Sequence, residues 1–175
     1  KNTDAVLFGD VAFDYTPTHS NNLSALHRGI QYDDETRGGY MPLPATAIEV
    51  EYISELLKIK EWSIKQFIQK EASEYNLKNV LSPRVLHIAT HGDFQAEKAD
   101  KKLGFFFESG LLSSWLCLTG ANNQMRLKNN HPDGGVFTAY EASLLNLKNT
   151  ELVVLSACNT GKGVVNNGNG VMGLQ

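Results

Sequence analysis

Short apolar runs separated by polar segments are the main pattern along the chain. Three of these runs predict buried strands, at 5–8, 85–90 and 151–157. The run at 85–90 is apolar nearly throughout, which is typical of a strand covered on both faces in a parallel sheet. The run at 151–157 predicts a second central strand. Weaker strand patterns lie at 62–67 and within 105–118.

A helix is predicted after Pro44. Thr46 and Glu49 have the spacing of a capping box, in which the threonine caps an exposed amide and the glutamate reaches back to the start of the helix. The apolar residues that follow fall on one helical face. They are Ala45, Ile48, Tyr52, Ile53, Leu56 and Leu57.

Two further helices complete the pattern. Residues 69–79 predict a polar surface helix, and Thr138 with Glu141 forms a second capping box that opens a short helix through Leu147. Loops are predicted for the polar, aperiodic segments, which are 14–42, 93–104, 119–135 and 159–170. Because strands alternate with helices, the chain is predicted to have an α/β fold with a parallel sheet flanked by helices.

Composition and charge limit the classes of protein to which this chain can belong. The 175 residues suffice for one domain with a buried core, and 42% apolar with 20% charged residues is ordinary for a globular protein. A net charge of -3 argues against direct nucleic-acid contact, and no apolar run approaches the roughly 20 residues that span a membrane. Two cysteines form no disulfide framework, which favours a reducing, cytoplasmic location. No metal-ligand spacing is present, so neither a metal nor a cofactor is expected.

The candidate chemistry lies where two apolar runs end. His91 follows one predicted strand and Cys158 follows another. Ligands gather at the carboxyl edge of parallel sheets, and side chains leaving adjacent strands there approach within roughly 5–8 Å. An imidazole raises the reactivity of a nearby thiol, and the backbone amides of Gly92 and Cys158 are candidates for an oxyanion hole.

Other reactive residues have plainer interpretations. Cys117 lies in an apolar stretch and is predicted to be a core residue, and His87 alternates along a buried strand as a hydrogen-bonded core histidine. Glu141 is either a pocket acid or only a capping residue. The glycines of 168–173 have dinucleotide-binding spacing but lack the preceding strand and turn, which leaves nucleotide binding as a weak third hypothesis.

Two segments carry a family resemblance. Residues 83–94 (Pro-Arg-Val-Leu-His-Ile-Ala-Thr-His-Gly-Asp-Phe) resemble the histidine motif of CHAT domains, which are caspase-like cysteine peptidases often fused to tetratricopeptide repeats. Residues 152–161 (Leu-Val-Val-Leu-Ser-Ala-Cys-Asn-Thr-Gly) are similar to the cysteine motif of that family. Weaker landmarks follow in the family's order. They lie at 43–50, 109–112, 134–141 and 168–174.

The resemblance implies a caspase-like three-layer α/β sandwich with a mainly parallel central sheet. It implies His91 as general base and Cys158 as nucleophile, with peptide-bond hydrolysis through a thioester acyl-enzyme. Candidates for the substrate pocket are Asp93, Glu141 and Asn159. The family commonly has Glu where this chain has Asn159, and Gly-Glu-Gly where it has Gly-Asn-Gly at 168–170. Both changes remove negative charge near the site, which weakens the argument for an acidic pocket that selects Arg or Lys.

The leading hypothesis is therefore a cytoplasmic cysteine endopeptidase of the caspase-like type, which cleaves protein or peptide substrates and is activated conditionally, by a regulatory partner or by processing. The alternative is a catalytically silent CHAT-like scaffold that binds a partner protein through the same cleft. Residues 1–175 are expected to form a catalytic domain that is incomplete at its C-terminus, because the family continues beyond this point. The resemblance also leads us to expect repeat helices preceding it in the parent protein.

Overall fold

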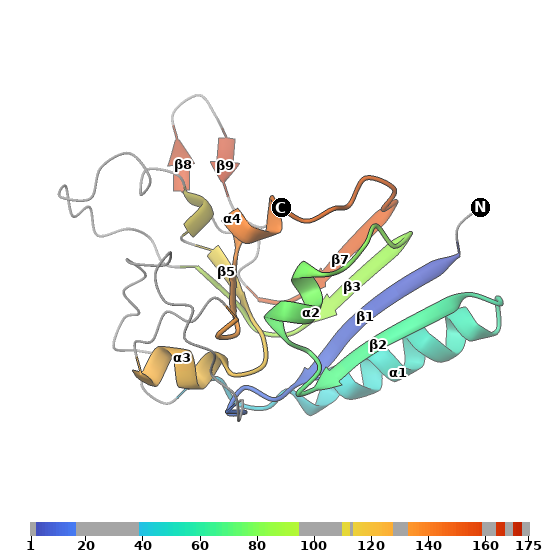
Figure 1. The fold of residues 1–175 in the computed structure, drawn as a ribbon, viewed down its shortest axis with the longest axis horizontal. Coiled ribbons are helices and arrows are strands. Elements are labelled where there is room, and N and C mark those ends of the chain that lie inside the picture. Colours follow the sequence, from blue (N-terminus) through green and yellow to red (C-terminus); the bar gives the residue numbers. More distant parts are fainter. Residues whose placement is uncertain are drawn as a thin grey trace.

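A four-stranded parallel sheet forms the centre of the molecule (Figure 1). The computed structural model describes residues 3–16, 39–94, 110–112, 114–127, 133–158, 164–166 and 170–172. The strand order is β2-β1-β3-β7. The strands are β1 (Asp4–Val11), β2 (Ser63–Gln69), β3 (Val85–Ala89) and β7 (Leu152–Ser156). The predicted α/β fold with a mainly parallel sheet is confirmed.

The strand order creates a switch point at the carboxyl edge of the sheet. From β1 the chain crosses to β2 on one side, and then returns past β1 to β3 on the other side. Connections from the two neighbouring strands β1 and β3 therefore leave in opposite directions, which is the arrangement at which open α/β sheets usually bind their ligands. Because β7 pairs with β3 in parallel, its carboxyl end lies at the same edge.

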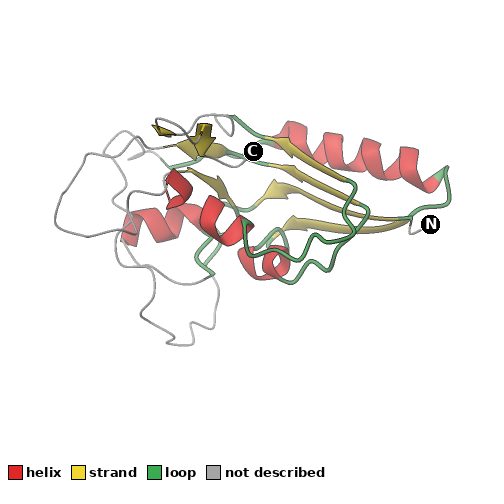
Figure 2. Cartoon of the chain, turned by 90° about the horizontal axis from the view of Figure 1, so that it is seen from above, coloured by secondary structure: helices red, strands yellow, loops and turns green. Residues whose placement is uncertain are grey.

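Helix α1 (Pro44–Lys58) covers one face of the sheet (Figure 2). Val50 from α1 packs in one cluster with Ala5 and Leu7 of β1 and Ala89 of β3. The helix crosses β1 closely at Gly9, because a Cβ on this glycine would lie 2.6 Å from Val50 Cγ2 and 3.0 Å from the Thr46 carbonyl oxygen. The small residue thus sets the separation between helix and sheet.

The larger core lies on the opposite face of the sheet. Helix α2 (Glu74–Lys78) buries Leu77 there, against residues from β1, β2, β3 and the smaller second sheet. The largest fully buried side chains of this core are Phe8, Leu77, Leu86, Leu116, Leu118 and Phe137. Helices thus lie on both faces, so the molecule is a three-layer sandwich (Figure 2).

A second, antiparallel sheet lies beyond the carboxyl edge of the first. It consists of β4 (Gly92–Phe94), β5 (Ser114–Cys117) and β6 (Val136–Thr138), in that order. The remaining elements are a 3-10 turn at Gly110–Leu112, α3 (Ala121–Leu127), α4 (Ala139–Ala142) and a hairpin of β8 (Val164–Asn166) with β9 (Gly170–Met172).

The predicted cap and buried face of α1 are wrong. Because Pro44 occupies the first turn, the helix begins before Thr46, and its N-cap residue Leu43 has no side-chain cap. The Thr46 hydroxyl instead donates to the Leu43 carbonyl and accepts the Asp10 amide. Glu49 points to the sheet. The buried helix residues are Thr46, Val50 and Ser54, so most of the predicted apolar face is exposed.

Other boundaries also differ from the predictions. The predicted surface helix at 69–79 shrinks to α2, whose Glu74 and Leu77 are buried. Residues 119–135, predicted as a loop, contain α3, and the predicted helix through Leu147 ends at Ala142. The loop predicted for 159–170 contains β8 and the start of β9. Among the described strands, β7 lies at the sheet edge and exposes Leu152, so it is not central there.

Across the parts of the chain that the structure describes, no helix combines the length and apolar character needed to cross a membrane.

Candidate functional site

The structure brings the two predicted strand ends together. β3 and β7 are hydrogen-bonded neighbours, and their last paired residues are Ala89 and Ser156. The pairing extends by one more bond, because the Thr90 amide donates to the Ser156 carbonyl at 3.2 Å. His91 and Cys158 each lie two residues past that last pair, beyond the carboxyl ends of these neighbouring strands.

The ring of His91 is held in a defined orientation. Its Nε2 atom lies 2.9 Å from the carbonyl oxygen of Met41. The rings of Phe13 and Tyr40 flank it, with centroids 5.2 and 5.1 Å away. Because a carbonyl oxygen only accepts hydrogen bonds, Nε2 carries the proton of this bond and Nδ1 of the neutral ring is left as the proton acceptor.

The backbone that binds His91 is itself fixed by a buried asparagine. The Asn122 side chain accepts the Tyr40 amide at 2.6 Å and donates to the Tyr40 carbonyl at 3.0 Å and to Asp14 at 3.1 Å. Gly39 has a φ of 73° and passes so close that a Cβ would lie 2.9 Å from Asn122. These contacts position the Met41 carbonyl against the imidazole.

The Tyr40 side chain links this segment to the second sheet. Its hydroxyl donates to the Asp93 carboxylate at 3.2 Å and accepts from the Trp115 indole at 3.3 Å. Burial raises the pKa of Tyr40, with Cys117 and Asp93 adding to the effect, so the phenol stays protonated. The Asp93 carboxylate also accepts the Phe94 amide, at 2.7 Å. Asp93 is therefore half-buried in a hydrogen-bonded network beside His91.

Gly92 begins β4 directly after the histidine. The Cys117 amide donates to the His91 carbonyl at 2.9 Å, and Gly92 pairs with Leu116 in the next register position. Since bonded and non-bonded pairs alternate along an antiparallel ladder, the Gly92 amide points away from β5. The Gly92 amide therefore lies on the edge of β4 opposite β5, and the residue itself is buried.

The two thiols have opposite environments. Cys158 is exposed in the turn after β7, whereas Cys117 is buried in β5, as predicted. Burial raises the pKa of Cys117, which keeps its sulfur a neutral thiol. Only Cys158 of this pair is thus placed to meet a molecule from solution.

A family model for the CHAT domain matches residues 9–175, nearly the whole chain, including both strand ends described above. The chain belongs to the CHAT family. This assignment and the parallel sheet with helices on both faces agree with a caspase-like fold, in a family related to peptidases. A search of curated proteins and a search of solved structures gave no significant match.

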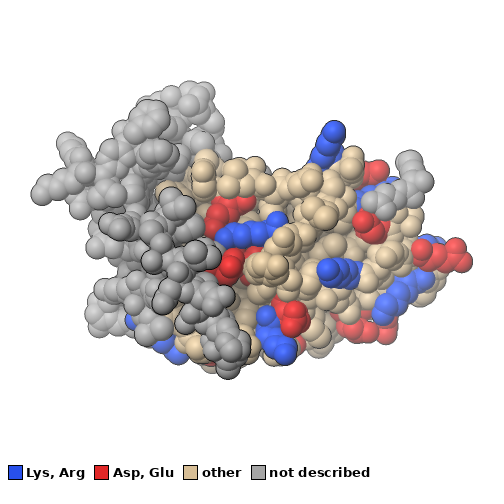
Figure 3. All heavy atoms as spheres, in the orientation of Figure 1, with Lys and Arg blue, Asp and Glu red and all other residues tan. Residues whose placement is uncertain are grey.

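In this CHAT domain, Glu141 serves as a capping residue. Its carboxylate accepts the Thr138 amide and hydroxyl, while the Glu141 amide donates to the same hydroxyl, so the predicted second capping box is confirmed. Lys78 lies 3.0 Å from Glu141 and 2.6 Å from Glu74. Figure 3 shows a basic group flanked by acidic groups between α2 and α4, where this network lies. Asn159, the third predicted pocket residue, lies outside the described residues.

Sequence reasoning missed a polar contact beneath the candidate site of the CHAT domain. Glu49 of α1 lies 3.0 Å from Nε2 of His87 and accepts the Ser156 hydroxyl at 3.2 Å. It thereby ties α1 to both β3 and β7. Burial lowers the pKa of His87, an effect that Glu49 opposes. The alternation of His87 along β3 identified it as a core residue, but no local pattern pointed to its partner on α1.

Within the described segments, no group of three or more His, Cys, Asp or Glu residues could hold a metal ion. The described residues place the His91 imidazole and the Cys158 thiol beyond this edge of the sheet.

Proposed function

We propose that this CHAT domain is a cysteine endopeptidase in which Cys158 is the nucleophile and His91 the general base. One observation carries the proposal: β3 and β7 pair in parallel, and both residues lie two positions past their last paired residues. Exposure of Cys158 and the fixed ring of His91 support the same assignment. The family relation to caspase-like peptidases supports the reaction class.

The reaction proceeds in two halves. The Cys158 thiol transfers its proton to Nδ1 of His91, and the sulfur attacks the carbonyl carbon of the scissile peptide bond. The C–N bond then breaks as the imidazole returns this proton to the leaving amine, which leaves a thioester on Cys158. Water attacks the thioester with His91 as base, and a carboxylic acid and the free thiol are released.

Fixed donors around the sulfur lower the barrier. The amides of Gly92 and Cys158 are proposed to bind the oxygen that becomes negative during each attack, since such donors stabilise charge that develops in the transition state. The Met41 carbonyl holds the imidazole with Nδ1 free and stabilises the imidazolium that forms. Asp93 contributes to this site by holding Tyr40.

Cys158→Ala and His91→Ala should each lower peptide cleavage by the full-length protein at least about a thousandfold, because each removes a group that bonds to the reacting atoms. The measurement is cleavage of a proteome-derived peptide library, read by mass spectrometry. Cys117→Ala is the matched control, since it removes the buried thiol, and it should retain cleavage.

If the domain is instead a catalytically silent scaffold, the Cys158→Ala and His91→Ala variants should behave differently. A scaffold would capture its partner protein equally well as wild type and as Cys158→Ala, and no peptide bond would be cut by either form. Cleavage products that disappear in His91→Ala would exclude it. Regulation by a partner or by processing is part of our proposal, so the assay includes cell extract as a source of activator.

A further inference from the structure

Helix α1 exposes an apolar stripe to solvent. Ile48, Tyr52 and Leu56 recur every four residues and are 73%, 62% and 47% exposed, and Ile59 follows at the C-cap with 73%. The residues that α1 buries are instead small or polar, apart from Val50. A helix in a globular protein normally buries such a stripe, and exposed apolar patches of this kind mark interaction sites.

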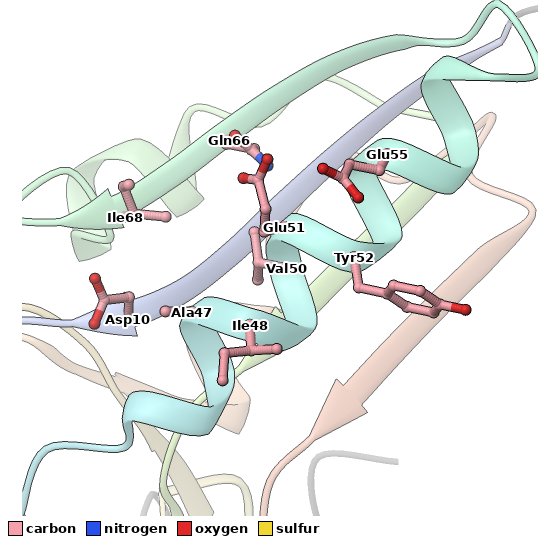
Figure 4. Close-up of a pocket in the computed structure, with 9 residues that line it drawn as sticks. All are labelled: Asp10, Ala47, Ile48, Val50, Glu51, Tyr52, Glu55, Gln66 and Ile68. Carbon is pink, nitrogen blue, oxygen red and sulfur yellow. The ribbon is translucent and has the colours of Figure 1, made fainter.

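The stripe borders a groove between α1 and β2 (Figure 4). Ile68 of β2, itself 44% exposed, faces it from the sheet side together with Gln66. The groove has a volume of about 510 Å³, and Ile48 and Tyr52 are among its lining residues on α1. In Figure 4 Val50 and Glu51 point from α1 toward β2, whereas the Tyr52 ring points away from β2 on the outer side of the helix. Apolar side chains thus line it from both elements.

The charged residues that line the groove are all acidic. Asp10, Glu51 and Glu55 line it, and none of its nine lining residues is Lys or Arg. The nearest basic residue of β2, Lys65, alternates to the opposite face of the sheet, where its ammonium group lies over the Phe67 ring. An occupant with basic groups beside an apolar stripe would complement this surface.

A second copy of the chain would not complement it. In a symmetric dimer the same groove contributes to both sides of the interface, so the carboxylates of Asp10, Glu51 and Glu55 from one copy would meet those of the other. Like charges facing each other across an interface are destabilising. The charge pattern therefore favours a different chain as the occupant.

We propose that the α1–β2 groove docks an amphipathic helix of a partner protein, in which Lys or Arg residues flank an apolar stripe. The 15-residue helix α1 is about 22 Å long, which accommodates three to four turns of a partner helix. Apolar residues four apart form the ridges that pack against such a helix, and the flanking carboxylates bind its cations. The groove is separate from the carboxyl edge of the sheet where Cys158 lies, so the docking proposal does not depend on the proposed peptidase activity.

Three designed 18-residue peptides test the proposal. All share an apolar stripe with i, i+4 spacing; the first has flanking lysines, the second has glutamates there, and the third has the lysines and a central proline. Fluorescence anisotropy with the full-length protein should show the lysine peptide binding at least tenfold more tightly than either of the others. Equal binding of the lysine and glutamate peptides, or of the proline peptide, would overturn the proposal.

Variants of exposed residues test where on the protein the lysine peptide binds. Tyr52→Ser should weaken the lysine peptide at least tenfold, whereas Tyr140→Ser, at a tyrosine that is also about half exposed, should leave its affinity unchanged. Reversing Glu51 and Glu55 together to lysine should make the glutamate peptide the tighter ligand. Unchanged affinities, or a dimer of the protein that Tyr52→Ser dissociates, would show that the occupant is not a basic helix.

Discussion

The orientation of the His91 imidazole depends on contacts with single residues far away in the sequence. The sequence motif marks the residue, but its orientation depends on Met41, Tyr40 and Phe13, which precede it by 50 or more residues. None of these contacts follows from local spacing. The sequence thus predicts a reactive role for His91, whereas the fold supplies the Met41 carbonyl that selects the tautomer of its ring.

The contrast between the two thiols yields a prediction at the residue scale. In the native protein, iodoacetamide should alkylate Cys158 at least tenfold faster than Cys117, because the first is exposed and burial raises the pKa of the second. Peptide mass spectrometry after timed quenching measures both rates. Unfolded protein serves as the control, in which the rates should converge. Equal rates in the native state would contradict the assignment of Cys158 as the accessible nucleophile.

A second prediction concerns Glu74. Burial, with Glu141 close by, raises its pKa from 4.5 to about 9, although Lys78 and the Gly135 amide oppose the shift. Between these two values the folded state binds more protons than the unfolded state, so stability falls as the pH rises. Glu74→Gln should remove this dependence.

The measurement for Glu74→Gln is urea unfolding at pH 5.5, 7 and 8.5. Relative to wild type, the variant should become progressively more stable as the pH increases. Glu71→Gln is the matched control, since this carboxylate is exposed, and its stability should run parallel to wild type. A difference between Glu74→Gln and wild type that is constant across the three pH values would contradict the raised pKa.

At the scale of elements, α1 shows the limits of sequence periodicity. Of the predicted apolar face, Ile53 and Leu57 pack against the core, whereas its other four residues are exposed, so the pattern predicted the wrong buried side for most of the helix. The inner face is instead selected by the close crossing of β1, which requires small side chains such as Thr46 and Ser54, and by the contacts of Glu49 with β3 and β7. These are tertiary constraints that override the local pattern.

The same crossing yields a prediction about packing. Gly9→Ala should destabilise the protein by about 1–3 kcal/mol, because the new methyl group would meet Val50 Cγ2 at 2.6 Å. Removing that atom with Val50→Ala should recover part of the loss in the double variant, since the Thr46 carbonyl remains at 3.0 Å. Urea unfolding of the two single variants and the double variant tests this. Simple additivity of the two effects would contradict the close approach.

At the scale of the whole molecule, the alternation of strands and helices predicted the fold class and the parallel sheet. The adjacency of β3 and β7, which are separated by more than 60 residues, was an assumption behind the pairing of His91 with Cys158, and the structure shows it. The apolar runs alone do not fix the strand order, and β7 lies at the sheet edge and not at its centre. The second sheet and α3 were not predicted in this form, because β4 and β6 have three residues each and carry little periodicity.

The measurement that tests the central claim most directly is the alkylation rate of Cys158 at pH 7 in wild type and in His91→Ala. If the imidazole activates the thiol, the variant should react at least tenfold more slowly in the native state and at the same rate once unfolded. An unchanged native rate would show that His91 and Cys158 do not act together, and would contradict the account.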